Sequence, residues 1–422
     1  MTFKINQTMK TIKYIVMVFA LWALTSNLQA QKLSEIYKDS IIQLTVVKDY
    51  GLKNNWEQIF YDYNKVSRRT QIGKMKNIIV APDGSVFMSD KTTYTIAKFD
   101  KDGNFVKRFG QKGTKNRDFL YDPIIAGIVD NKYVITHDVQ GRIQLFSLDG
   151  NFVKLIKLDY IPNRIVPLKG SVIAILGSVI IKDNRIKNII AIKNLETGVE
   201  KIIWQKTEQR GISSINISEN LSIYNPLLQF SGDYYSPLIE CNKKGDLIVA
   251  LPNSGEIMQY SKEGNLLKKF KSDISPLAVT TEDIQAHIDQ WKQRLISLLD
   301  RAKYSREEKE KKINEFDTKV QNQLEQGLYT KNLPYFSSFI MDSDDNLLLF
   351  EFTKEKTNQF KVYTLTLEGK SIATTSFQSD DCTLSFIPGK FAFHNGFVYA
   401  MAMLKQGGGN IPLRLMKFEV KN

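Results

Sequence analysis

Short apolar runs separated by polar turns fill most of the chain, and one pattern of runs and turns occurs twice in succession over residues 75–158. Two independent turn positions keep the same spacing between the copies. Gly103 and Gly150 are 47 residues apart (150 − 103), and Gly84 and Asn131 are also 47 apart (131 − 84). A period of about 40–50 residues with four short strands per unit is typical of a propeller blade. The pattern therefore predicts an all-β propeller.

Weaker copies of the pattern follow, and they bring the expected number of blades to six. These copies occupy residues 164–198, 238–268, 339–370 and 391–420. The last copy has Leu413–Val420 as its third strand and no fourth strand after it. We expect a strand from the N-terminal region to complete this blade, because a ring closed by both termini leaves no unpaired edge. Three apolar runs could supply that strand: 41–47, 58–63 and 66–72.

Two connections between the predicted blades are longer than the period allows. Gly198 and Gly264 are 66 residues apart (264 − 198), and Gly264 and Gly369 are 105 apart (369 − 264). The additional residues fall at 205–236 and 272–335, each time between the fourth strand of one blade and the first strand of the next. All connections of this kind open on one face of a propeller, so both insertions are expected on the same face.

The second insertion has the pattern of an α-helical hairpin. Thr280 with Asp283, and Ser305 with Glu308, have the spacing of capping boxes, and apolar residues at helical spacing follow each pair. The sequence therefore predicts a six-bladed propeller with a helical hairpin at about residues 280–328, between blades four and five.

The N-terminal residues have the pattern of a secretory signal peptide. Three lysines precede an apolar run over 14–24, and the small residue Ala30 follows a polar segment. That run has 11 residues (24 − 14 + 1), fewer than the roughly 20 that span a bilayer. We expect residues 1–30 to be removed, leaving a soluble periplasmic or extracellular protein of residues 31–422. Because Gln31 and not cysteine follows Ala30, a lipid anchor has no attachment residue.

Charge and cysteine content narrow the possible partners. The net charge of +13 falls to about +10 when the three leader lysines are removed (13 − 3), and the basic residues are scattered along the chain. Export argues against nucleic acid as a partner, and anionic glycans or a membrane surface fit the charge better. We expect no transmembrane helix and a monomer. Cys241 and Cys382 are 141 residues apart, so the sequence leaves their pairing open, and two small buried side chains are favoured.

The sequence contains no recognisable catalytic motif. Its three histidines are His137, His287 and His394, and neither Gly-x-Ser-x-Gly nor His-Glu-x-x-His occurs. The acidic stretches 100–104 and 342–346 lack the glycine and glutamate positions of a calcium-binding EF-hand and suit strand turns. A non-catalytic protein without cofactor or metal is the favoured interpretation. The alternative is a calcium-dependent, lactonase-like hydrolase with a site on the propeller axis, where Glu240 is the main polar exception among apolar inner strands.

Part of the chain resembles a known family. The segments Phe109–Gly113 and Phe119–Pro123 resemble the linker between NHL-type repeats. Gln71-Ile72-Gly73, together with the Asp-Gly-Asn-Phe-Val turns, resembles a family of exported six-bladed β-propellers (NHL-like or TolB-like) of Gram-negative gut bacteria. The resemblance implies a fold, an exported location and a link to glycan-utilising systems, and it supplies no catalytic residues. The helical hairpin departs from the simplest family pattern.

Aromatic and arginine side chains gather in the connections that open on the insertion-bearing face. Aromatic rings stack on sugars and anchor peptides, and arginines bind acidic groups. The alternative is that the aromatic rings pack between blades. We therefore expect this face to bind a glycan, a peptide or a partner protein, with a uronic-acid or sulfated glycan suiting a basic and aromatic basin. The candidate ligand-binding residues are Arg117, Tyr121, Arg164, Tyr234, Tyr235, Tyr335 and Phe336.

Overall fold

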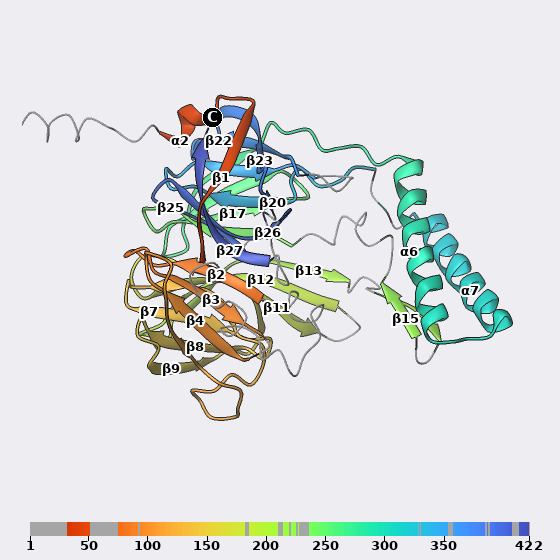
Figure 1. Ribbon diagram of the computed structural model, residues 1–422, viewed down its shortest axis with the longest axis horizontal. Helices are drawn as coiled ribbons and strands as arrows, with labels where there is room; N and C mark the ends of the chain where they lie inside the picture. The colour runs from red at the N-terminus through yellow and green to blue at the C-terminus, as the bar shows by residue number, and fades with distance from the viewer. Residues whose placement is uncertain are drawn as a thin grey trace, which may run out of the picture.

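The structure is a computed structural model with an all-β, propeller-like fold (Figure 1). Four separate four-stranded sheets and one nine-stranded sheet are arranged around an axis. The structure describes residues 32–50, 75–91, 93–181, 185–209, 214–218, 221–224, 227, 236–327, 329, 331–352, 358–384, 386, 389–406 and 413–421. Two candidate ligand-binding residues, Tyr234 and Tyr235, lie outside these residues, and so do the apolar runs 58–63 and 66–72.

Each four-stranded sheet is an antiparallel meander, in which every strand pairs with the next one along the chain. The first sheet contains β2 (Met75–Val80), β3 (Val86–Asp90), β4 (Thr95–Phe99) and β5 (Phe105–Phe109). The second contains β6 (Ile124–Val129), β7 (Tyr133–His137), β8 (Arg142–Ser147) and β9 (Phe152–Lys157). The third contains β10 (Ile161–Pro167), β11 (Val172–Ile181), β12 (Arg185–Asn194) and β13 (Glu200–Gln209). The fourth contains β16 (Leu238–Cys241), β17 (Leu247–Leu251), β18 (Glu256–Tyr260) and β19 (Leu266–Lys271).

The nine-stranded sheet joins two meanders through a strand from the N-terminal region. One meander contains β20 (Ser338–Met341), β21 (Leu347–Phe350), β22 (Phe360–Leu365) and β23 (Ser371–Gln378). The other contains β25 (Phe391–His394), β26 (Phe397–Leu404) and β27 (Leu413–Lys421), and the short strand β24 (Cys382–Thr383) also pairs with β26. Strand β1 (Ile41–Asp49) pairs antiparallel with β27 and parallel with β23. Of the three apolar runs that could complete the last sheet, the first is therefore the one that pairs with the C-terminal strand.

The strands form because apolar residues alternate toward the spaces between sheets, where they make separate buried clusters. Short turns between strands need residues that tolerate positive φ. Gly103 (φ 81°) and Gly150 (φ 76°), the two glycines that define the repeat, both adopt this conformation. A side chain at either position would also collide with a neighbour, Lys48 for Gly103 and Phe109 for Gly150. The repeat in the sequence is thus the repeat of these turns.

Two helices lie between β19 and β20 and pack on each other at one edge of the molecule (Figure 1). They are α6 (Thr281–Arg301) and α7 (Arg306–Glu325), and each begins with a capping box, made by Thr280 and Ser305. Their apolar faces share one cluster with Leu227 from the preceding long connection. That connection also contains a two-stranded hairpin, β14 (Ser214–Ser218) and β15 (Leu221–Tyr224), and β14 contacts α7. Among the described residues, no helix is long and apolar enough to cross a membrane.

We predict that the sheets fold without the helix pair, because the cluster that buries the apolar faces of α6 and α7 is separate from the clusters between the sheets. Replacing residues 281–327 by a short Gly/Ser loop should leave one cooperative thermal unfolding transition. Circular dichroism should show lost helical signal and retained strand signal. A non-cooperative melt of the shortened protein would mean that the helix pair belongs to the core of the sheets.

Candidate functional site

A cavity of about 1370 Å³ lies on the axis, among the first strands of the sheets. These strands are neighbours in the order β25, β2, β6, β10, β16 and β20. All six contribute lining residues, so the cavity is enclosed by strands that are far apart in the sequence. Aliphatic residues of the inner strands and polar side chains line the wall in comparable shares.

The two ends of the cavity differ in the kind of chain segment that surrounds them, because all the first strands run in the same direction. Each first strand begins after the connection from the preceding sheet and ends in a short turn, so all the short turns lie at one end. At that end the short helix α2 (Leu33–Ile36) contributes Leu33 and Ile36 to the cavity wall. The Leu33 N–H donates a hydrogen bond to Asp344 Oδ2, in the β20–β21 turn, at 2.9 Å. Figure 1 shows α2 beside the C-terminal end of the chain. The N-terminal segment therefore covers part of the short-turn end.

An ion pair crosses the wall between β10 and β16. The Arg164 guanidinium contacts Glu240 Oε1 through Nη2, and its Nε donates to the backbone carbonyl of Ile239 at 3.0 Å. About a fifth of each side chain is exposed, 23% for Arg164 and 21% for Glu240, and both line the cavity. Burial raises the pKa of Glu240, while the neighbouring Arg164 opposes that rise. The pair offers hydrogen-bonding groups to the cavity without a large net charge.

The cavity as a whole is not basic. Its charged lining residues among the described part of the chain are Lys32, Arg164 and Lys243 against Glu240, Asp342, Asp344, Asp345 and Glu419. The basic basin predicted from the arginines in the connections of the insertion-bearing face stays a prediction, and the lining of the axial cavity does not share that basic character. Asp342 and Asp345 already accept backbone hydrogen bonds, from Asn346 N (2.9 Å) and Lys243 N (2.8 Å). These carboxylates stabilise turns at the short-turn end.

The wall opposite the ion pair is aromatic. In the order of the first strands, β25 is three positions from β10, so the two lie across the axis from each other. Phe393 on β25 is half-buried, lines the cavity and packs edge-on against Phe391 at 5.2 Å between ring centres. Phe393 is the third residue of the four-residue β25, as Glu240 is of the four-residue β16. The two side chains thus occupy the same depth along their strands.

Arg117 and Tyr121 lie on the connection between β5 and β6, away from the lining of the axial cavity. Both are exposed: 63% of the Arg117 side chain and 39% of Tyr121. Arg117 Nε is 3.9 Å from Asp118 Oδ1, and Asp118 itself is buried. These two candidates could therefore contact a ligand on the surface of this connection.

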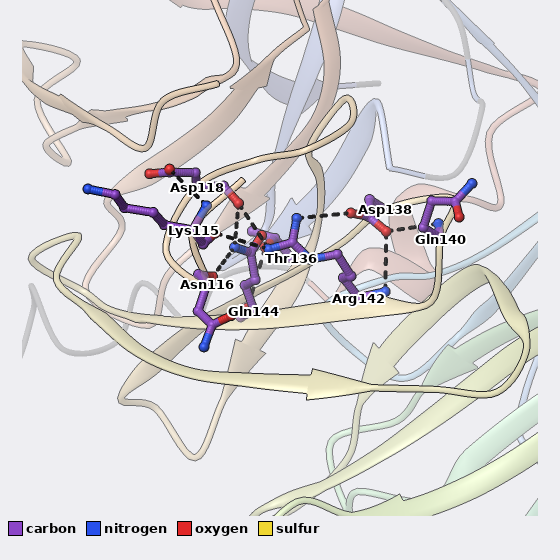
Figure 2. Close-up of polar contacts among 8 residues, drawn as sticks. All are labelled: Lys115, Asn116, Asp118, Thr136, Asp138, Gln140, Arg142 and Gln144. Carbon is purple, nitrogen blue, oxygen red and sulfur yellow. Dashed lines mark hydrogen bonds and ion pairs between the residues drawn. The ribbon is translucent and has the colours of Figure 1, made fainter. Parts of the chain in front are cut away.

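Figure 2 shows what holds this connection in place. Gln144 Nε2 donates to the carbonyls of Asn116 (2.7 Å) and Asp118 (2.9 Å). Arg142 Nη2 donates to the carbonyls of Lys115 (3.3 Å) and Asp118 (3.2 Å). Asp138 Oδ1 accepts the backbone N–H groups of the turn after β7, including that of Arg142 at 3.2 Å. Asp138 is therefore a turn cap, and the arginine beside it is structural.

Tyr335 and Phe336 precede β20 and pack against neighbouring sheets. Phe336 is fully buried in the core, so its ring has no surface to offer a ligand there. Tyr335 is half-buried, its ring packs against Gly255, and Lys271 Nζ lies 5.0 Å from the ring centre. Of the seven candidates, Arg164 is the one that lines the axial cavity among those the structure describes.

Further groups that could take part in catalysis or metal binding are an acidic stretch and two cysteines. Asp100 Oδ1 accepts the backbone N–H groups of Asp102 (2.9 Å) and Asn104 (2.8 Å), so this acidic stretch is a strand turn. No group of three or more His, Cys, Asp or Glu side chains that could hold a metal occurs in the described part of the chain. Cys241 and Cys382 are both free thiols, and burial raises the pKa of Cys382 to about 11.

Two features of the site were not identified from the sequence. Leu33, Ile36 and Tyr37 have helical spacing and are all buried, which could have marked α2 as a packed element. The partner of Arg164 could not be identified, because Glu240 is 76 residues away and no local pattern links the two.

Comparison with protein-family models finds no match, and neither does comparison with curated proteins. Several solved structures are similar in chain arrangement. A catalytically inactive variant of virginiamycin B lyase from Staphylococcus aureus, with quinupristin, is 11% identical over 82% of this chain and 80% of its own (TM-score 0.39). A Bacteroides fragilis protein described as exported is 10% identical over 90% and 95% (TM-score 0.44). A member of the DUF4221 family from Bacteroides vulgatus is 14% identical over 82% and 93% (TM-score 0.41). At these identities the similarity concerns the fold alone.

Proposed function

We propose that the protein is an exported, non-catalytic binding propeller that holds its ligand in the axial cavity. The observation that supports this most directly is the cavity itself, which is large enough for a small ligand. Its wall combines apolar residues with convergent polar groups such as Arg164 and Glu240, and ligand pockets typically combine the two. A glycan, a peptide or a segment of a partner protein would enter from the end opposite α2.

We further infer six blades. In this interpretation the nine-stranded sheet is two blades, β20–β23 and β25–β26–β27–β1, which share an edge because β1 pairs with both β27 and β23. The helix pair α6–α7 is then an insertion between the fourth and fifth blades, on the end of the ring where ligand enters. Residues 1–30 are the leader of the exported protein, and 31–422 the mature chain.

The proposal predicts that filling the cavity blocks binding. Asn163 is exposed, lines the cavity and donates to Ser178 Oγ at 2.7 Å. A tryptophan there places a large ring in the cavity without disturbing the buried core. For a ligand found on a glycan and peptide array, Asn163→Trp should weaken binding by about tenfold or more. Isothermal titration calorimetry on the mature protein gives the two dissociation constants.

Val199→Trp is the matched control for this experiment. Val199 is 67% exposed in the β12–β13 turn and does not line the cavity. It should bind like the unmodified protein, and both variants should melt within a few degrees of it. Equal affinity of Asn163→Trp and the unmodified protein would place the ligand elsewhere, for example on the connection that bears Arg117 and Tyr121.

A further inference from the structure

The chemistry of the cavity wall narrows the ligand class, if the proposed function holds. One wall carries the Arg164–Glu240 ion pair, and the opposite wall carries Phe393. Aliphatic residues, including Ile78, Ile124 and Leu238, lie beside them in the lining, together with polar side chains such as Asn77 and Asn163. A ligand that fits must present hydrogen-bonding groups to one side and an apolar face to the other.

The ion pair selects against charge in the ligand. Arg164 is already neutralised by Glu240, and its Nε is occupied by the Ile239 carbonyl. An anionic ligand would have to displace Glu240 and leave that carboxylate without its partner in a partly buried site, which is costly. A cationic ligand would leave Arg164 in the same position. A neutral ligand can hydrogen-bond to both side chains while the pair stays intact.

We propose that the ligand of the axial cavity is a neutral pyranose sugar, bound with its hydroxyl groups on the Arg164–Glu240 pair and its C–H face against Phe393. Adjacent hydroxyls both donate and accept, so they match a carboxylate next to a guanidinium. The C–H face of the ring is apolar and packs on an aromatic side chain. This assignment differs from the acidic glycan that the arginines in the connections of the insertion-bearing face suggested.

The experiment measures binding to the mature protein by calorimetry or by ligand-observed NMR. The neutral probes are the methyl glycosides of glucose, galactose and mannose. Glucuronic and galacturonic acid and a sulfated galactose are the anionic probes. A blocked neutral dipeptide represents the peptide class. We expect at least one neutral glycoside to bind about tenfold or more tightly than its uronic acid, a difference that one desolvated charged group accounts for.

The variant Glu240→Gln tests the role of the pair. It keeps the side-chain shape and leaves Arg164 as an unneutralised cation facing the cavity. We expect weaker binding of the neutral glycoside by about tenfold and a reversed preference, toward the uronic acid. Because a lone buried cation can destabilise the protein, the double variant Arg164→Gln/Glu240→Gln provides a folded form with neither charge. It should bind neither probe class as tightly as the unmodified protein binds the neutral sugar.

Phe393→Leu tests the opposite wall, and Lys132→Gln, at an exposed side chain that does not line the cavity, is the control. The first should weaken binding of the neutral glycoside, and the second should leave it unchanged. Preference of the unmodified protein for a uronic acid or for the dipeptide would overturn the proposal, as would the absence of saturable binding by any neutral glycoside. If Asn163→Trp still blocks whichever probe binds, the binding propeller stands and only the sugar class is wrong. If Asn163→Trp blocks nothing, the proposed function itself fails.

Discussion

Replacing Leu44 with aspartate should prevent the protein from forming a cooperatively folded state. Leu44 is fully buried on β1, within the largest apolar cluster, and its neighbours come from both meanders of the nine-stranded sheet. An unpaired carboxylate there costs several kcal/mol, comparable with the whole stability of a typical domain of about 5–15 kcal/mol. Strand β1 is also the single element that pairs with both β23 and β27. Loss of its packing therefore separates the two ends of the chain.

The milder substitution Leu44→Ala gives this prediction a measurable size. Removing a buried leucine side chain typically costs about 2–5 kcal/mol, which urea denaturation followed by circular dichroism resolves. Val47→Ala is the matched control on the same strand. Val47 is 45% exposed and falls where the register with β27 shifts, so its loss should cost no more than about 0.5 kcal/mol. A cost below about 1 kcal/mol for Leu44→Ala would show that β1 lies outside the cooperative core.

The parts of the fold that could be predicted are those determined by local chemistry. Positive-φ glycines at Gly103 and Gly150 fix the turn spacing, and that spacing is visible as a repeat. The helix starts at Thr280 and Ser305 depend on residues three positions apart, so both capping boxes could be identified in the sequence. In each case the residues that determine the structure are neighbours along the chain.

The parts that could not be predicted depend on residues that are distant in the sequence. Three apolar runs fitted the closing strand equally well, because pairing with β27 leaves no local signal in the run that pairs. The cavity wall is a stronger example. Arg164 was selected for its place near a connection of the insertion-bearing face, and its pairing with Glu240 follows only from the packing of β10 against β16. The sequence therefore could not show that the arginine in the cavity wall is paired with a carboxylate.

Packing between distant residues also gives two arginines near the β5–β6 connection different roles. Arg117 is on the β5–β6 connection and 63% exposed, whereas Arg142 is on β8 and only 8% exposed. Yet it is Arg142 that donates to the carbonyls of Lys115 and Asp118, and its Nη1 lies 3.9 Å from Asp138 Oδ2. The buried arginine supports the connection (Figure 2), and the exposed one lies on its surface.

We predict that Arg142→Met lowers the free energy of unfolding by about 3 kcal/mol or more. Methionine keeps much of the buried stem, but it leaves the Asp138 carboxylate and the carbonyl of Asp118 with fewer partners in a buried site. Hydrogen exchange should also rise at the amide of Phe119, which donates to the Gln111 carbonyl at 2.8 Å within this connection. Arg117→Met, the matched substitution, should change the unfolding free energy by no more than about 0.5 kcal/mol.

The two variants also distinguish a residue that holds the β5–β6 connection in place from a residue that binds a ligand. If Arg117 contacts a ligand, Arg117→Met weakens binding of that ligand in a protein that melts normally. Arg142→Met then weakens binding only because the β5–β6 connection is less stable. Saturating ligand should therefore restore part of the hydrogen-exchange protection that this variant loses. Equal stability of Arg142→Met and the unmodified protein would mean that Gln144, whose amide donates to the carbonyls of Asn116 and Asp118, holds the connection on its own.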